Sequence, residues 1–129
     1  MSNNEQLPMK QYRLSFSDII DHQNGIVEAI VDEGTEVSAK QMHELHDFMQ
    51  ALTPPAHGLF ANRKNSYSFT FSGLASARQL HGIHAVAEVT HGKTRNKVVK
   101  ALWPASMKLQ FFDTETEALE WLKKSIKKT

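Results

Sequence analysis

The chain has 129 residues, of which 40% are hydrophobic, 22% are charged and none is cysteine, and its formal net charge is +1. This length and composition predict one globular domain that buries its own core. The absence of cysteine excludes a disulfide framework, a cysteine-based metal site and a thiol nucleophile. A pI of about 8.0 is too low for the basic footprint of a nucleic-acid-binding domain, so we expect no nucleic-acid partner.

The first third of the chain predicts a tail and a β-hairpin. Residues 1–9 are polar, lack the apolar core of a signal peptide and predict a disordered tail before a domain at residues 10–129. Residues 11–16 alternate polar and apolar side chains, as a half-buried strand does, and residues 26–31 predict a second strand. Residues 18–25 are expected to form the turn between them, because Asn24-Gly25 is a strong hairpin signal.

A helix is expected next, from its cap at Ser38 to about residue 52. Apolar side chains recur there at helical spacing, and Pro54-Pro55 ends the helix. The members of this apolar stripe are Met42, Leu45, Phe48, Met49 and Leu52.

The second half predicts alternating strands and helices. Strands are expected at residues 58–61, 83–89 and 108–112, a short helix at 73–80, and a basic helical stretch from residue 90 to Trp103. Thr114 and Glu117 form a capping-box pattern that opens a last helix. The order β-β-α-β-α-β-α-β-α predicts an α/β domain with a five-stranded mixed sheet and about four helices. No run of apolar residues is long enough to span a membrane, so a cytoplasmic protein is expected.

This element order, the Ser72-Gly73-Leu74 motif and the terminal sequence FFDTETEALEWLKK at residues 111–124 resemble the SpoIIAA-like (STAS) fold. Within it, the chain is similar to small bacterial STAS/SEC14-type proteins of mostly unassigned function, over roughly residues 10–125. In anti-sigma-factor antagonists of the STAS group, a partner kinase phosphorylates the serine that Ser72 matches. Thr70 and Phe71 stand where that motif has Asp and its first Ser, so the sequence departs from the motif there.

Residues 62–74 combine four hydroxyl residues, two basic residues and three aromatic residues after a predicted strand. Free backbone N–H groups point outward at such a strand-to-helix junction, which favours a binding or regulatory site. A purely structural alternative makes Ser72 a helix N-cap and packs Tyr67, Phe69 and Phe71 inward at period two. The candidate interaction or modulated residues are Arg63, Asn65, Tyr67, Ser68, Ser72 and Thr90.

Two other groups of residues are candidates for chemistry. The basic residues Lys93, Arg95, Lys97 and Lys100 alternate with apolar ones and fit either anionic lipid headgroups or a solvated helix face. The doublets His43/His46 and His81/His84 lack an established metal spacing, so neither a metal nor another cofactor is expected. Because nucleophile-elbow and phosphate-loop motifs are also missing, we expect no enzyme.

The sequence therefore favours a non-enzymatic interaction module, which binds an unidentified partner protein through the 62–74 loop. The alternative is a domain that binds a small ligand or anionic lipid, with a pocket under that loop and the basic 93–103 helix. Homodimerisation through the edge of the opening hairpin stays open.

Overall fold

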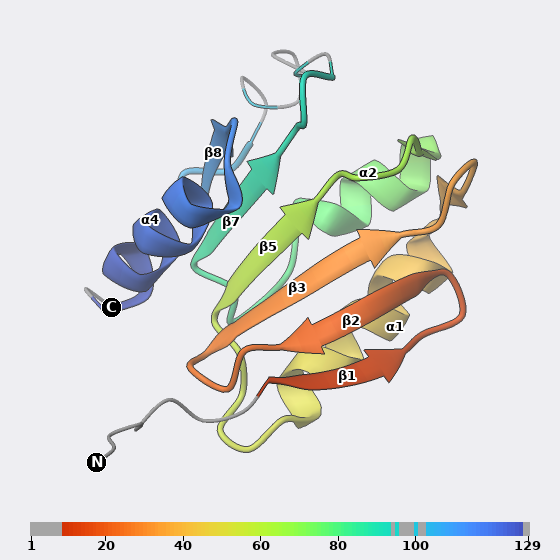
Figure 1. Cartoon of the computed structure of the whole chain (residues 1–129). Helices are drawn as coiled ribbons and strands as arrows, with labels where there is room; N and C mark the ends of the chain where they lie inside the picture. Colours follow the sequence, from red (N-terminus) through yellow and green to blue (C-terminus); the bar gives the residue numbers. More distant parts are fainter. Residues whose placement is uncertain (1–8, 94, 96–99, 101–102, 128–129) are drawn as a thin grey trace.

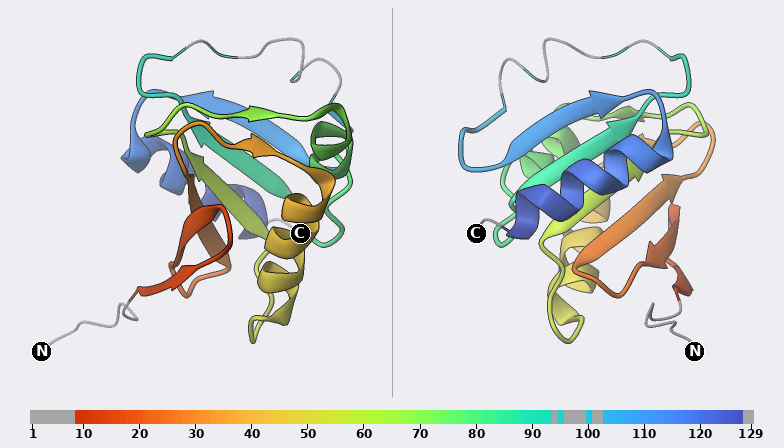
Figure 2. Two further views of the ribbon diagram at one scale, coloured as in Figure 1. Left: turned by 90° about the vertical axis from the view of Figure 1, so that its right-hand side faces the viewer. Right: turned by 60° about the vertical axis from the view of Figure 1, so that its left-hand side comes forward.

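The computed structural model describes residues 9–93, 95, 100 and 103–127. Six strands form a mixed sheet in the order β1-β2-β3-β5-β7-β8, with helices on both of its faces (Figures 1 and 2). The strands are β1 (Lys10–Arg13), β2 (Ser17–Asp21), β3 (Ile26–Val31), β5 (Gly58–Asn62), β7 (Ala85–Val89) and β8 (Lys108–Phe112). The remaining elements are β4 (Glu36–Val37), β6 (Ser68–Phe69), α1 (Ala39–Ala51), α2 (Phe71–Ala77) and α4 (Glu115–Lys127).

The mixed α/β class is confirmed, with one more strand in the main sheet than the five predicted. Strands β1, β2 and β3 are antiparallel neighbours, and β3, β5, β7 and β8 are parallel. The short strands β4 and β6 form a separate two-stranded parallel pair that the sequence did not predict. Two residues are too few to give a periodic hydrophobic pattern, so this pair has no sequence signal.

The opening of the chain differs from the single hairpin expected. Asn24-Gly25 does form the turn before β3, with Gly25 at φ +89°. However, residues 18–21, expected in the turn, belong to strand β2, and the expected strand at 11–16 ends at Arg13. Asp18 and Asp21 lower the strand propensity of this segment, while Ile19 between them is completely buried. Burial of Ile19 in the core overrides that local preference.

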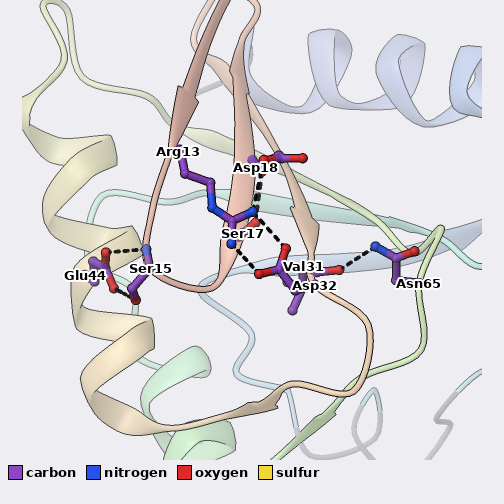
Figure 3. A network of polar contacts seen from close by, with 8 residues as sticks. All are labelled: Arg13, Ser15, Ser17, Asp18, Val31, Asp32, Glu44 and Asn65. Atoms are coloured by element: carbon purple, nitrogen blue, oxygen red, sulfur yellow. Dashed lines mark hydrogen bonds and ion pairs between the residues drawn. The ribbon is translucent and has the colours of Figure 1, made fainter.

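Polar contacts fix the opening strands to their neighbours (Figure 3). The Arg13 guanidinium of β1 donates to Asp18 on β2 and to Asp32 beyond β3. The Ser15 backbone N–H donates to Glu44 of α1 at 2.9 Å. At the end of β3, the Val31 carbonyl accepts a hydrogen bond from the Asn65 side-chain amide at 3.0 Å. The Asn65 bond holds the loop after β5 against the end of β3.

Both long helices begin as predicted. The Ser38 hydroxyl accepts from the Gln41 N–H at 3.3 Å, and the Gln41 side chain accepts from the Ser38 N–H at 3.0 Å, a complete capping box. Before α4, the Thr114 hydroxyl accepts from the Glu117 N–H at 3.3 Å. Helix α1 ends before Pro54, because proline cannot continue the helical hydrogen bonding.

The sheet separates two apolar cores. Strand residues alternate between its faces, so Ala29, Leu59 and Val86 pack with α1 and α2. Phe60 and Ala87 lie on the opposite face and pack with Leu122 of α4. None of the described helices is long and apolar enough to cross a bilayer. The predicted tail, except for Met9, lies outside the described residues, as does half of the predicted 90–103 helix. The helical stretch expected from Thr90 is wrong at its start, because residues 91–92 form a turn with His91 at φ +51° and Gly92 at φ +80°.

Candidate functional site

A cavity of about 320 Å³ lies between the sheet and the helices α1 and α2. Most of its described lining is apolar, and the strands β3, β5, β7 and β8 all contribute to it. Helix α1 contributes Met42 and Leu45, and helix α2 contributes Leu74 and Ala77. The volume is at the lower end of the range for small-molecule pockets.

Four residues with polar side chains, Arg63, Tyr67, Ser68 and Glu88, line the same cavity. The Arg63 guanidinium lies 4.7 Å from the centre of the Tyr67 ring and donates to the Tyr67 carbonyl at 2.6 Å. Its Nη1 lies 3.7 Å from Oε2 of Glu88, and both side chains are mostly buried, with exposed fractions of 22% and 17%. An otherwise apolar cavity therefore has one charged pair in its wall.

Burial changes the acid–base behaviour of this group. Loss of solvent raises the pKa of Glu88 above its ordinary value, and the nearby Arg63 and Arg95 charges oppose that rise only in part. Burial also raises the pKa of the Tyr67 phenol, and the Glu88 charge adds to that rise. Tyr67 therefore stays protonated at neutral pH, and Glu88 takes up a proton more readily than an exposed glutamate.

Two hydrogen-bond donors of the lining are buried without an acceptor. Within the described part of the chain, neither Nε of Arg63 nor Nε1 of Trp103 has a hydrogen-bond partner. Both residues line the cavity. Both nitrogens have almost no accessible surface, so each of these enclosed, unsatisfied donors costs about 1–3 kcal/mol.

The 62–74 segment divides between cavity and surface. Arg63, Tyr67 and Ser68 line the cavity, so the cavity lies under this loop, where the ligand-binding alternative expected a pocket. Asn65 instead anchors the loop to the Val31 carbonyl, so its amide has a structural role. The structure thus brings three of the predicted residues to one site.

Thr70, not Ser72, caps helix α2, so the structural alternative for Ser72 is wrong. The Thr70 hydroxyl accepts from the Gly73 N–H at 2.9 Å, whereas Ser72 is exposed in the first turn. Inward packing of the aromatics holds only in part, because Phe69 is 37% exposed and Phe71 is 94% exposed. The chain turns into a helix at Phe71, and the period-two alternation of a strand ends there.

Gly73 in the predicted Ser-Gly-Leu motif has a steric role. A Cβ atom at this position would lie 2.0 Å from the carbonyl oxygen of Val37. Only glycine lets α2 approach the backbone of β4 so closely.

The other predicted site residues lie outside this cluster. Thr90 is 1% exposed, so its side chain cannot contribute to the surface on which it was predicted. Arg95 forms an ion pair with Asp113 at 2.6 Å. Lys100 donates to Gln110 at 3.2 Å, and Lys93 donates to the Lys64 carbonyl at 3.4 Å. Lys97 lies outside the described residues.

Sequence reasoning missed a second polar cluster, on the opposite face of the sheet. Asn62 donates to Glu28 at 2.7 Å and contacts His91 at 2.6 Å, and His22 contacts Glu28 at 2.9 Å. Burial alone would raise the pKa of Glu28, but the hydrogen bonds from His22 and Asn62, with the charges of His22 and Lys64, lower it overall. The sequence signal for this cluster was Glu28, a charged residue inside the apolar strand at residues 26–31.

No metal-binding group emerges in the part of the chain that the structure describes, where no three His, Asp or Glu side chains converge. His46, from the first doublet, contacts the His81 carbonyl at 2.7 Å instead.

Comparison with known proteins assigns neither a family nor an activity to this chain. No family model and no curated protein matches the chain. Among solved structures, it is similar to an uncharacterized protein of the DUF3478 family with a SpoIIAA-like fold, from Shewanella loihica PV-4. The two share 14% identity over 95% of this chain and 98% of the other, with a TM-score of 0.49. The sequence motifs resemble a fold of the same name, but a likeness of this size carries no argument about the fold or the function of this chain.

Proposed function

We propose that this protein is a non-enzymatic binding domain that holds a small, mostly apolar molecule in the cavity under the 62–74 loop. The observation that carries this proposal is the cavity of about 320 Å³ with its mostly apolar lining. Natural cores rarely leave voids larger than a water molecule. At roughly 30 Å³ per water-sized group, this cavity holds about ten non-hydrogen atoms.

Binding of straight-chain alcohols tests this function without involving a charged head group. The chain contains two tryptophans, and Trp121 lies on α4 on the other face of the sheet, against Phe112. In a Trp121→Phe variant, all tryptophan fluorescence comes from Trp103 in the cavity wall, so a change in this fluorescence measures alcohol binding. Each methylene added from butanol upward should tighten binding by about 0.8 kcal/mol, or about fourfold, until the chain exceeds the cavity.

A cavity-filling variant supplies the matched control. Ala61 lines the cavity, so Ala61→Leu should abolish octanol binding while keeping the melting temperature, because its three added carbon atoms occupy space that octanol needs. Ala51→Leu makes the same change at the exposed end of α1 and should leave binding unchanged. Equal binding by the parent and by a folded Ala61→Leu variant would contradict the proposal.

A second candidate function is docking of a partner protein at the start of α2, supported by the exposure of Phe71 (94%) beside Phe69. Ser72, which is also exposed, is the residue whose phosphorylation would add negative charge there. Phe71→Ser and Ser72→Asp should change partner affinity in this case. Neither substitution should change alcohol binding, so the two functions are separable.

A further inference from the structure

We infer that the molecule held in this cavity is an uncharged alcohol, whose hydroxyl group donates a hydrogen bond to the carboxylate of Glu88. The inference rests on the proposed function and specifies its ligand. Three features of the cavity wall support it: an acceptor that the described residues leave without a hydrogen bond, apolar surroundings, and a local charge that is already balanced.

Glu88 presents an acceptor to the cavity. Side chains of β7 alternate between the two faces of the sheet, so Ala87 packs toward α4, whereas Val86 and Glu88 point to the cavity side. The Glu88 side chain keeps 17% of its surface exposed, so it is not completely enclosed. In this respect it differs from Nε of Arg63 and Nε1 of Trp103, which have almost no accessible surface. A ligand in the cavity can therefore reach it.

Within the described part of the chain, no group donates a hydrogen bond to this carboxylate. Nη1 of Arg63 lies 3.7 Å from Oε2 of Glu88, beyond the roughly 3.2 Å limit of an N–H···O hydrogen bond. Nη2 of Arg63 donates to the Tyr67 carbonyl instead, at 2.6 Å. An ionised carboxylate only accepts hydrogen bonds. The ligand group that pairs with Glu88 must therefore carry a hydrogen-bond donor.

The surroundings of Glu88 fit the apolar part of an alcohol. Its partners in the sheet are Ala61 on β5 and Phe111 on β8, which line the same cavity. A hydroxyl group that leaves water for such a place needs a new acceptor, and pairing with the carboxylate supplies one. Space for about ten non-hydrogen atoms fits octanol, which has eight carbons and one oxygen.

The charge around Glu88 is balanced without the ligand. Arg63 forms its ion pair, the Arg95 charge also acts on it, and the Tyr67 phenol is neutral. All other described residues of the lining are uncharged. A carboxylate ligand would add a second negative charge beside Glu88, and an ammonium ligand would add a further positive charge beside Arg63. An uncharged donor avoids the cost of burying either charge.

The test compares two isomers in the Trp121→Phe protein, by the fluorescence of Trp103. Octanol and 1-methoxyheptane contain the same atoms, but only octanol has a hydrogen-bond donor. A purely apolar cavity would prefer the ether, because the ether gives up fewer hydrogen bonds with water. Donation to Glu88 should reverse this order, so octanol should bind at least about tenfold more tightly at pH 8. Octanoate and octylamine should each bind at least about tenfold more weakly than octanol.

Glu88→Gln assigns this preference to Glu88. The glutamine amide can donate to the ether oxygen, which a carboxylate cannot do, so the two isomers should bind with similar dissociation constants. Glu120→Gln makes the same change at an exposed position of α4 and should keep the preference for octanol. Melting temperatures establish that both variants are folded.

Titration of Glu88 supplies a second readout, which needs no substitution of that residue. A protonated carboxyl group can donate to the ether, so the preference for octanol should decline as pH falls toward the ordinary glutamate pKa. Arg63 and Arg95 stay charged and Tyr67 stays neutral over this range, so Glu88 is the group that titrates in the described wall.

The outcomes separate the two proposals. Equal binding of the isomers, or tighter binding of the ether, overturns the assignment of an alcohol and leaves the cavity function standing. A preference for octanol that persists unchanged in folded Glu88→Gln, or at low pH, overturns the role of Glu88. Tighter binding of octanoate or octylamine than of octanol overturns the uncharged head group. Failure of both isomers to bind overturns the proposed function itself.

Discussion

Replacing Gly73 by alanine should destabilise the protein, although alanine is the better helix former. The added Cβ would lie 2.0 Å from the Val37 carbonyl oxygen, 2.9 Å from its carbonyl carbon and 3.1 Å from the Thr70 hydroxyl. The first two atoms belong to the backbone, so they cannot rotate away as a flexible side chain can. Helix α2 and strand β4 must therefore separate.

The magnitude follows from three contributions. Overpacking costs about 1–3 kcal/mol. Separation also breaks the hydrogen bond from the Thr70 N–H to the Val37 carbonyl, 2.9 Å long, which contributes about 1 kcal/mol. Helix propensity returns about 1 kcal/mol when alanine replaces glycine. We expect a net loss of about 3 kcal/mol at the upper limit of overpacking, or a fall of about 12 °C in melting temperature at roughly 4 °C per kcal/mol.

Urea unfolding followed by circular dichroism measures this loss. Ser72→Ala is the matched control, because Ser72 is exposed in the same helical turn and should change the free energy of unfolding by less than about 0.5 kcal/mol. A Gly73→Ala protein as stable as the parent, or more stable, would refute the close approach of α2 to Val37. Helix propensity alone predicts that opposite result.

The remaining predictions concern charged, capping and exposed residues. Burial raises the pKa of Glu88, so the folded state binds more protons than the unfolded state between the ordinary glutamate pKa and the raised one. The free energy of unfolding should therefore fall as pH rises through this range. Glu88→Gln should flatten that part of a plot of unfolding free energy against pH. The pKa of Glu28 is lowered, so the ionised Glu28 side chain should stabilise the fold above the ordinary glutamate pKa and lose this effect as pH falls. The difference in unfolding free energy between the parent and Glu28→Gln should therefore shrink in acid. Thr70→Ala removes the N-cap of α2 and should cost about 1 kcal/mol in urea unfolding. Phe71→Ser changes a side chain that is 94% exposed and should shift the free energy of unfolding by less than about 0.5 kcal/mol.

The fold was predictable where local chemistry agrees with the tertiary structure. Asn24-Gly25 marks a turn, Ser38 and Gln41 form a capping box, and Pro54 follows a helix end, each through contacts within a few residues. The strand at residues 17–21 was missed because its two aspartates have low strand propensity, and only the burial of Ile19 against distant residues stabilises it.

The candidate site was predictable only in part, for a physical reason of the same kind. The composition of residues 62–74 predicts a site, and three of the candidate interaction residues in this loop, Arg63, Tyr67 and Ser68, line the cavity. Glu88 joins them only because β5 and β7 are parallel neighbours in the sheet. The Asn62–Glu28 contact likewise joins residues 34 positions apart, beyond the reach of any local pattern.

The most direct test of the central claim is a nuclear magnetic resonance titration of ¹⁵N-labelled protein with octanol, observed at the two tryptophan indole N–H signals. A ligand of about ten atoms that gains roughly 0.4 kcal/mol per atom binds with a dissociation constant of about 1 mM. We predict a saturable shift of the Trp103 signal in this range, an unchanged Trp121 signal, and no Trp103 shift in Ala61→Leu. A Trp103 signal that stays unchanged at several millimolar octanol, or that moves equally in Ala61→Leu, would contradict a binding cavity under the 62–74 loop.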